Sequence, residues 1–435
     1  MMPALSLRRR QLSVMVLLFV GYAAYYFCRA DLSVATPLLV LELQQHGMSA
    51  DTALIRVGAI SSAGILAYAL GKFFLGGFSD LWGGKRGFLI GLGGAMGFTL
   101  LFAASGALPL FTFAWIGNRL TQSVGWAGLL KVSGRWFDYS SYGMVLGVLS
   151  LSYLVGDACA RQGMGMLIDA GYGWRSLFCC AAAVVGVCFI ANAVWLRESR
   201  ALLGFSEPVV NPTNLYASHE THALSLRTLV LPLLRSRAFL LVCALSFGCT
   251  VVRESFNTWT PMYLQGHLGY TTGSAARFSA IFPAVGAISV LLAGWLSDRM
   301  GLHGRALLLT VGLVVTALAL MALTGVPAST GATFAPLMLI GLVAFALLGP
   351  YSYLGGAFAL DFGGRRAGAA SSGIIDGVGY FGGVLAGDSV ARVSVAFGWQ
   401  GVFVALAVVA GVSAIAAVCL YRTQRAVSAV ASVSL

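Results

Sequence analysis

The chain has 435 residues, of which 58% are hydrophobic and only 10% are charged, and its mean hydropathy is +0.86. Soluble domains carry about 25% charged residues, so the composition excludes an ordinary soluble domain and predicts a helical membrane protein. The apolar stretches are too long for a transmembrane β-barrel, whose strands alternate in hydropathy over about 10 residues. The net charge of +12 does not indicate nucleic-acid binding, because the basic residues fall in short loops and not on one face or arm.

Apolar stretches that suit the roughly 20 residues of a membrane-spanning helix recur along the whole chain. The first follows the basic run Arg8–Arg10 and lacks a small-residue cleavage site, so we interpret it as a retained helix and not as a signal peptide. The longest polar stretch, 197–237, predicts a cytoplasmic linker between an N-terminal six-helix bundle, 1–196, and a C-terminal six-helix bundle, 238–435. The predicted spans are 13–41, 54–80, 87–107, 109–132, 142–169, 176–196, 238–265, 275–297, 305–325, 333–360, 368–395 and 400–421.

Lysine and arginine are distributed unequally between the two sides of the predicted membrane. Arg56, Arg175 and Arg277 fall on one side, and the large majority fall on the other. Because cytoplasmic loops carry the excess of these residues, we expect both termini to be cytoplasmic. The predicted location is an integral position in a plasma membrane, which in a bacterium is the inner membrane.

Three motifs occur once in each half of the chain at nearly the same offset. GGFSDLWGGKR, with Asp80, and GWLSDRMGLHGR, with Asp298, are 218 positions apart. GWRSLF and GWQGVF are 225 positions apart, and RADLSVATP and RESFNTWTP are 224 apart. The repeats predict an all-α membrane protein of twelve transmembrane helices in two parallel six-helix pseudo-repeats, an architecture that places its site between the halves.

The loop that contains Asp80 and Arg86, and its second copy with Asp298 and Arg299, resemble the signature loop of the major facilitator superfamily. Longer stretches, among them GYAAYYFCRADLSVATPLL, QSVGWAGLLKVSGRWF and VVRESFNTWTPMYL, resemble the organophosphate:phosphate antiporters, which include glycerol-3-phosphate and hexose-phosphate transporters. The resemblance covers nearly the whole chain. It implies the major facilitator fold, and we expect the two loops to latch the cytoplasmic face.

The resemblance also implies a substrate site. Arg29 and Arg253 match the two arginines that bind phosphate in that family, and Lys72 matches a lysine of the second helix near the site. The tyrosines that match those lining the site are Tyr22, Tyr26 and Tyr380. Independently, planar guanidinium groups suit the oxygens of a phosphate dianion, and a charge in a membrane helix is a functional candidate because it is costly there.

Permanent ion pairs are the competing interpretation of these arginines. Asp31 lies two positions after Arg29, and Glu254 directly follows Arg253. On a helix, adjacent positions point about 100° apart and positions two apart point about 200° apart, so we expect neither carboxylate to face its arginine. The sequence predicts no role for Asp31, and it predicts none for Asp376, which also lies within an apolar stretch.

The chain departs from the family pattern at helix five, where Tyr153 replaces a histidine that contributes to the family's site. Predicted helix four carries the stretch RLTQSVG, which begins at Arg119. This stretch resembles a motif of proton-coupled members of the superfamily.

Two aspartates are further candidates for proton coupling, Asp157 and Asp388. Each has an arginine four positions later, Arg161 and Arg392, and this spacing favours an ion pair within one helix. The competing interpretation is that both pairs only neutralise charge.

We predict a secondary active transporter that moves an organic phosphate ester (a sugar phosphate, glycerol phosphate or phosphoglycerate) in exchange for inorganic phosphate by alternating access. A proton-coupled transporter of another organic anion and a receptor that senses a sugar phosphate with little transport are the alternatives. The sequence contains no nucleophile–base constellation or convincing metal-ligand cluster, so we expect no enzyme, cofactor or resident metal. The expected partners are a small phosphate-containing anion and the lipid bilayer, without nucleic acid, and the expected state is a monomer.

Overall fold

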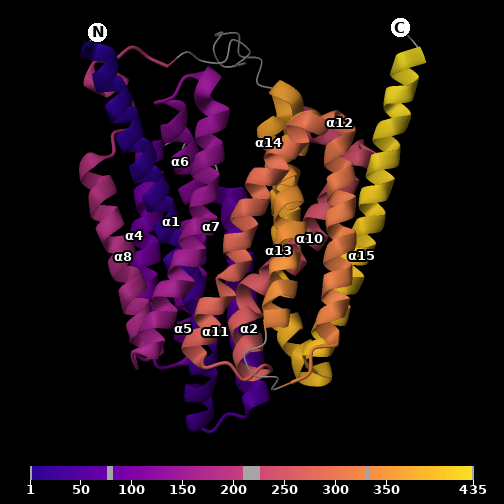
Figure 1. The fold of residues 1–435 in the computed structure, drawn as a ribbon. Helices are drawn as coiled ribbons and strands as arrows, with labels where there is room; N and C mark the ends of the chain where they lie inside the picture. Colours follow the sequence, from indigo (N-terminus) through magenta and orange to yellow (C-terminus); the bar gives the residue numbers. More distant parts are fainter. Residues whose placement is uncertain (1, 76–81, 209–225, 329–333, 434–435) are drawn as a thin grey trace. The chain divides into compact units, whose positions relative to one another are not determined.

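The computed structural model describes residues 2–75, 82–208, 226–328 and 334–433, and every regular element in these ranges is helical (Figure 1). A helix satisfies its backbone hydrogen bonds within one segment, which is what a segment in lipid requires. The all-α class predicted from the composition is confirmed.

The helices follow one another through short connections. Those of the N-terminal part are α1 (Met2–Gln45), α2 (Ala50–Leu75), α4 (Gly84–Ala104), α5 (Leu108–Gln122), α6 (Gly125–Gly134), α7 (Tyr139–Asp169), α8 (Trp174–Trp195) and the 3-10 helix η1 (Ala201–Leu203). Those of the C-terminal part are α9 (Leu226–Arg235), α10 (Arg237–Gly266), α11 (Thr272–Ser279), α12 (Ile281–Thr324), α13 (Phe334–Tyr353), the π-helix η2 (Leu354–Phe358), α14 (Ala359–Val384) and α15 (Asp388–Val433).

Ten helical stretches of the described chain are long and apolar enough to cross a membrane. They correspond to the twelve predicted spans once the local breaks in two regions of the chain are considered. The predicted fourth span is divided into α5 and α6, which have 15 and 10 residues. Each of the two helices is too short to cross a membrane alone. The eleventh and twelfth spans share the stretch Ser371–Arg425. This stretch is broken at 385–387, between α14 and α15, and again at Gly398, where a φ of 67° favours glycine.

The helix α12 contains parts of two predicted spans. It has 44 residues, and a straight α-helix of that length would measure about 66 Å, roughly twice the hydrocarbon thickness of a bilayer. The apolar stretches Thr272–Ser297 and Gly304–Thr324 overlap it and match the predicted eighth and ninth spans.

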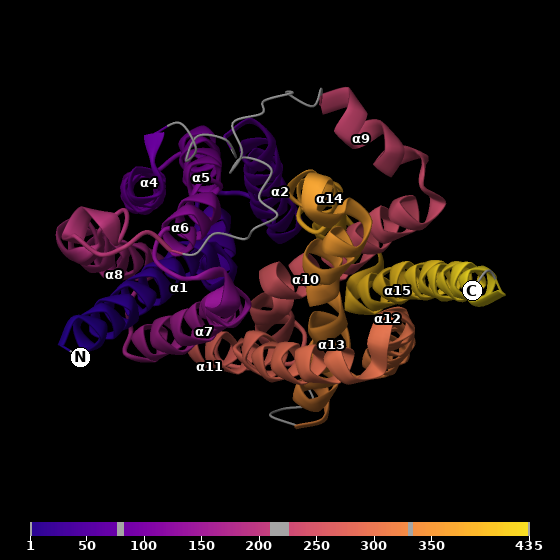
Figure 2. The ribbon, with the colours of Figure 1, turned by 90° about the horizontal axis from the view of Figure 1, so that it is seen from above.

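The chain forms two compact units. The first comprises Met1–Glu42, Ala63–Asn214 and Thr272–Ala280, and the second comprises Leu43–Ser62, Leu215–Thr271 and Ile281–Leu435. In the first unit, α4 packs against α5, α6 and α8, as Figure 2 shows from above. In the second unit, α10 packs against α14 and α15, and α12 packs against α13 and α15. The bundle boundaries expected at residues 196 and 238 remain a prediction.

The helix α1 is fixed in the first unit by a buried tyrosine. The hydroxyl of Tyr25 donates a hydrogen bond to the carbonyl oxygen of Phe88 on α4, at 2.6 Å. Glycine is required opposite this hydroxyl, because a Cβ atom at Gly91 or Gly125 would overlap the end of the Tyr25 side chain. The close approach of α1 to α4 and α6 determines where the next turns of α1, with Tyr26 and Arg29, lie.

Candidate functional site

Arg29 lies in the first unit against two tyrosine rings. Its Nη1 donates a hydrogen bond to the hydroxyl of Tyr26 at 2.8 Å. Its Cζ lies 4.9 Å from the ring centroid of Tyr26 and 4.3 Å from that of Tyr68, within the range of cation–π attraction. The arginine is half-buried, and Tyr68 is buried.

Tyr68 is the centre of a cluster of three cations. The Nζ of Lys72 lies 5.4 Å from its ring centroid, and the Cζ of Arg119 lies 5.5 Å away, in addition to Arg29. We call Arg29, Lys72, Arg119 and Tyr68 the Tyr68 cluster. Three like charges around one ring repel one another, so the arrangement favours an anion among them.

The predicted tyrosines of the first unit lie beside this cluster. Tyr22 packs on Tyr26 and on Trp126, with ring centroids 6.0 and 5.1 Å apart. Tyr153, which stands where the family has a histidine, packs on Tyr26 at 5.6 Å. A phenol there can donate or accept a hydrogen bond, but unlike a histidine it does not exchange a proton near neutral pH.

Arg253 lies in the second unit between a carboxylate and two further tyrosines. Its Nη2 forms an ion pair with Oε1 of Glu254 at 2.6 Å. Its Cζ lies 4.7 Å from the ring centroid of Tyr351 and 5.5 Å from that of the predicted Tyr380. We call these four residues the Arg253 cluster. Asp376, for which the sequence indicated no role, lies within electrostatic range of Tyr351.

The Arg253–Glu254 ion pair corrects the expectation that this carboxylate points away from its arginine. The angle of about 100° between adjacent positions constrains the Cβ atoms, but both side chains are long enough for their ends to meet. Only 11% of the Arg253 side chain and 10% of the Glu254 side chain are exposed. Losing one partner of such a buried pair is costly, because the other charge stays behind without compensation.

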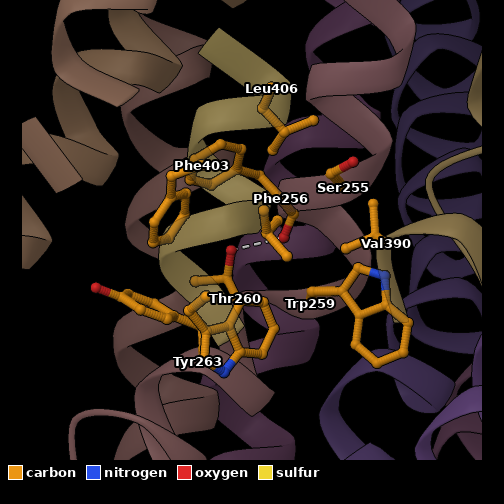
Figure 3. A pocket seen from close by; sticks show the side chains of 10 residues that line it. Ser255, Phe256, Trp259, Thr260, Tyr263, Val390, Phe403 and Leu406 are labelled. Atoms are coloured by element: carbon orange, nitrogen blue, oxygen red, sulfur yellow. Dashed lines mark hydrogen bonds between the residues drawn. The ribbon is translucent and has the colours of Figure 1, made fainter. Parts of the chain in front are cut away.

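A pocket next to Arg253 along α10 is too small for a sugar phosphate. It lies between α10 and α15, and Figure 3 shows the side chains that line it, including Phe256, Trp259, Thr260 and Phe403. Its volume is about 20 Å³, which is enough for about one water molecule. The hydroxyl of Thr260 donates to the carbonyl of Phe256 at 2.6 Å, so this polar group is satisfied within its helix (Figure 3).

The two predicted intrahelical ion pairs are confirmed. Arg161 Nε lies 2.9 Å from Asp157 Oδ1, and Arg392 Nε lies 2.7 Å from Asp388 Oδ2. The first pair is buried, and Nη1 of Arg161 also donates to the hydroxyl of Ser279 on α11 at 3.1 Å. The second pair is largely exposed. Both aspartates therefore have a fixed neutralising partner.

The predicted latch loops are described only in part. Asp80 and the side chain of Asp298 lie outside the described residues. The described part is helical and not a loop: Arg86 lies in the first turn of α4 and is exposed, and Arg299 lies within α12. The guanidinium of Arg299 stacks on the ring of Trp295 at 4.0 Å.

Glu198, which the sequence did not single out, organises the start of α4. Its carboxylate accepts hydrogen bonds from the backbone N–H groups of Gly84 (2.9 Å) and Lys85 (2.7 Å) and pairs with Arg135 at 2.9 Å. In the second unit, Arg305 pairs with Asp361 at 2.9 Å and also donates to Ser297. In each unit, a carboxylate thus contacts a latch motif: Glu198 contacts Gly84 and Lys85 in the first unit, and Asp361 contacts Arg305 in the second.

Tyr68 and Tyr351 are the other residues that sequence reasoning missed. Tyr68 precedes Lys72 by four positions, which places both on one face of α2 and was a usable signal. Tyr351 lies two positions before Tyr353, the last residue of α13. The π-helix η2 follows, and there the helical periodicity changes and cannot predict which face a side chain takes.

Long apolar helices that carry arginines packed on tyrosines are typical of a polytopic membrane protein that binds anions. The sequence profile of the Major Facilitator Superfamily matches residues 18–387, and the chain belongs to that superfamily. It is an integral multi-pass membrane protein. A solved structure of a bacterial homologue of the human lysosomal transporter Spinster shares the fold, with a TM-score of 0.73 at 14% identity and coverage of 95% of this chain and 97% of that one.

Curated relatives extend over nearly the same length. A probable hexose phosphate transport protein of Chlamydia trachomatis is 29% identical over 410 residues, covering 89% of this chain and 86% of the relative. The glycerol-3-phosphate transporter of Bacillus subtilis is 23% identical, with coverage of 92% and 89%. The membrane sensor protein UhpC of Escherichia coli is 25% identical, with coverage of 92% and 90%. The predicted likeness to the organophosphate:phosphate antiporters is confirmed, and none of these three relatives is named as an enzyme.

Proposed function

We propose that the protein exchanges an organic phosphate ester for inorganic phosphate across a bacterial inner membrane. The observation that carries the proposal is a similar arrangement in both units: an arginine, at positions that correspond in the sequence repeat, packs on two tyrosine rings, although the tyrosines themselves do not correspond in the repeat. Arg29 packs on Tyr26 and Tyr68, and Arg253 packs on Tyr351 and Tyr380.

In this proposal the phosphate group binds both guanidinium groups. Aromatic rings hold each guanidinium by one face and leave its edge of N–H donors for the oxygens of an anion. In the first unit, Lys72 and Arg119 add positive charge around Arg29. In the second unit, the phosphate replaces Glu254 as the partner of Arg253. The proposed transport cycle is one of alternating access.

The organic part of the substrate is proposed to be a small polyol, such as a hexose or glycerol. Two of the relatives are named for hexose phosphate and glycerol-3-phosphate. Hydroxyl groups of such a substrate can exchange hydrogen bonds with the phenols of Tyr22, Tyr26, Tyr153 and Tyr380. We further propose a monomer with both termini in the cytoplasm and with Asp80, Arg86, Asp298 and Arg299 in two segments that latch the cytoplasmic face.

The sensor relative supports one alternative function. A receptor would bind the same phosphate esters but transport them slowly. Binding of an ester at micromolar concentration without measurable flux would favour this alternative over exchange.

The test is counterflow in proteoliposomes that hold radiolabelled inorganic phosphate. The outside solution offers hexose phosphates, glycerol phosphate, phosphoglycerate or carboxylates without phosphate. We expect one class of phosphate ester to release the label and the carboxylates to release none. In the Arg29→Lys variant this release should be lost, because lysine keeps the charge but not the planar fork. The control Arg175→Lys changes an exposed arginine paired with Glu42 and should exchange normally. Release by carboxylates alone would refute the proposal.

A further inference from the structure

Asp31 occupies a local break in α1. Cys28 has φ −81° and ψ 17°, which is not helical. In a regular helix the N–H of Leu32 would donate to the carbonyl of Cys28. Here it donates to Oδ1 of Asp31 at 2.7 Å, and Nε2 of Gln122 donates to the carbonyl of Cys28 at 3.2 Å. One carboxylate oxygen of Asp31 therefore repairs the backbone at the break.

The other oxygen of Asp31 has no such function. Asp31 is fully buried, and its Oδ2 has no hydrogen-bond donor among the described residues. A buried charged oxygen without a donor is unfavourable by at least 1–3 kcal/mol, whereas a protonated carboxyl removes that charge. Capping the Leu32 N–H requires only Oδ1, so it does not explain why an acid stands here instead of an asparagine.

The charged and titratable groups around Asp31 come from three helices. Arg119, buried on α5, lies within electrostatic range of the carboxyl, and so does Cys28 on α1. The α2 residues Tyr68 and Lys72 face Arg119 and Arg29 in the Tyr68 cluster. On α4, Thr99 is polar but not titratable under ordinary conditions, and it accepts a hydrogen bond from Asn118 at 2.8 Å.

We propose that Asp31 is the proton-binding group of this transporter. Oδ2 takes a proton from water when Arg119 moves away and returns it to water on the other side when Arg119 approaches, because the guanidinium then stabilises the carboxylate. No other bond forms or breaks. The neighbouring Tyr68 ring joins the two events, since it contacts both Arg119 and the candidate phosphate ligand Arg29. A phosphate at Arg29 thereby changes the position of the cation that controls Asp31.

The aspartates singled out from the sequence suit this role less well. Asp157 and Asp388 each have an arginine of their own helix as a neutralising partner. The cation within electrostatic range of Asp31, Arg119, lies on another helix, so a relative motion of α1 and α5 can change the distance between the two groups.

The inference rests on the proposed transport function, and its test separates the two. Proteoliposomes with an internal pH-sensitive dye report proton movement, while labelled phosphate reports exchange. We expect a phosphate ester to move protons in the wild-type protein. The Asp31→Asn variant keeps an oxygen for the Leu32 N–H, so it should lose the proton movement but retain phosphate counterflow. Asp51→Asn, which changes an exposed acid at the start of α2, is the matched control and should retain both.

Several results would overturn the inference. Proton movement that persists in Asp31→Asn, or that disappears in Asp157→Asn or Asp388→Asn instead, would place the proton elsewhere. Exchange without any proton movement in the wild type would leave the proposed function intact and refute the inference. Proton-coupled flux of a carboxylate without phosphate counterflow would refute the proposed function and leave the inference about Asp31 intact. If Asp31→Asn does not fold, Asp31→Glu should shift the pH midpoint of transport, and an unchanged midpoint would count against Asp31.

Discussion

Glu254 is predicted to compete with the substrate for Arg253. The two side chains pair at 2.6 Å with about nine-tenths of each side chain buried, so a phosphate has to displace a good partner. The variant Glu254→Gln keeps the shape but removes the charge. A net hydrogen bond to a charged group is worth about 1.5–3 kcal/mol and a neutral one about 0.5–1.5 kcal/mol, so the competitor weakens by about 1–1.5 kcal/mol. The dissociation constant of phosphate should then fall about 5- to 12-fold.

Equilibrium binding of labelled phosphate to the purified protein measures this change. The matched control is Glu42→Gln, which breaks the exposed Arg175–Glu42 pair of the first unit and should leave binding unchanged. Combining Glu254→Gln with Arg253→Lys gives a double-mutant cycle, and the gain from Glu254→Gln should shrink when the fork of Arg253 is absent. Weaker phosphate binding in Glu254→Gln would refute the reasoning, because it would mean that the carboxylate helps to hold Arg253 in its binding position.

Three further predictions concern other parts of the molecule. Tyr68→Leu should lower the apparent affinity for phosphate in counterflow about tenfold, because about 1–2 kcal/mol of cation–π attraction is lost. Tyr68→Phe keeps the aromatic ring, so its apparent affinity should stay within twofold of the wild type. Glu198→Gln should lower the unfolding free energy by about 1–2 kcal/mol in detergent melts, because it removes a charge from the first N–H groups of α4; an unchanged melting curve would contradict this. Asp157→Asn should lower the free energy of unfolding by about 3–5 kcal/mol, because it removes the carboxylate that compensates the buried Arg161. Asp388→Asn, in a largely exposed pair, should lower it by at most about 1 kcal/mol. Equal losses of stability in the two variants would argue against burial as the cause.

The sequence predicted the features that depend on periodicity and not those that depend on side-chain reach. Apolar stretches set the spans, and an i,i+4 spacing predicted both the Asp157–Arg161 and the Asp388–Arg392 pairs. The break between α5 and α6 within the fourth span has neither a Pro nor a Gly of positive φ, so no residue at the break predicts it. Contacts between helices, such as that of Tyr68 with Arg29, depend on the packing of distant segments and have no signature within either segment.

The two units repeat the same sequence motif but compensate its charge differently. In the first unit, the charged neighbours within reach of the Tyr68 ring are the cations Lys72 and Arg119, which increase the attraction for an anion at Arg29. In the second unit, Glu254 already neutralises Arg253. The field that attracts a phosphate is therefore stronger in the first unit, while the second can hold its arginine buried without a ligand. Such an asymmetry lowers the cost of keeping both arginines buried in an empty transporter, because one half keeps its own counter-ion until the substrate replaces it.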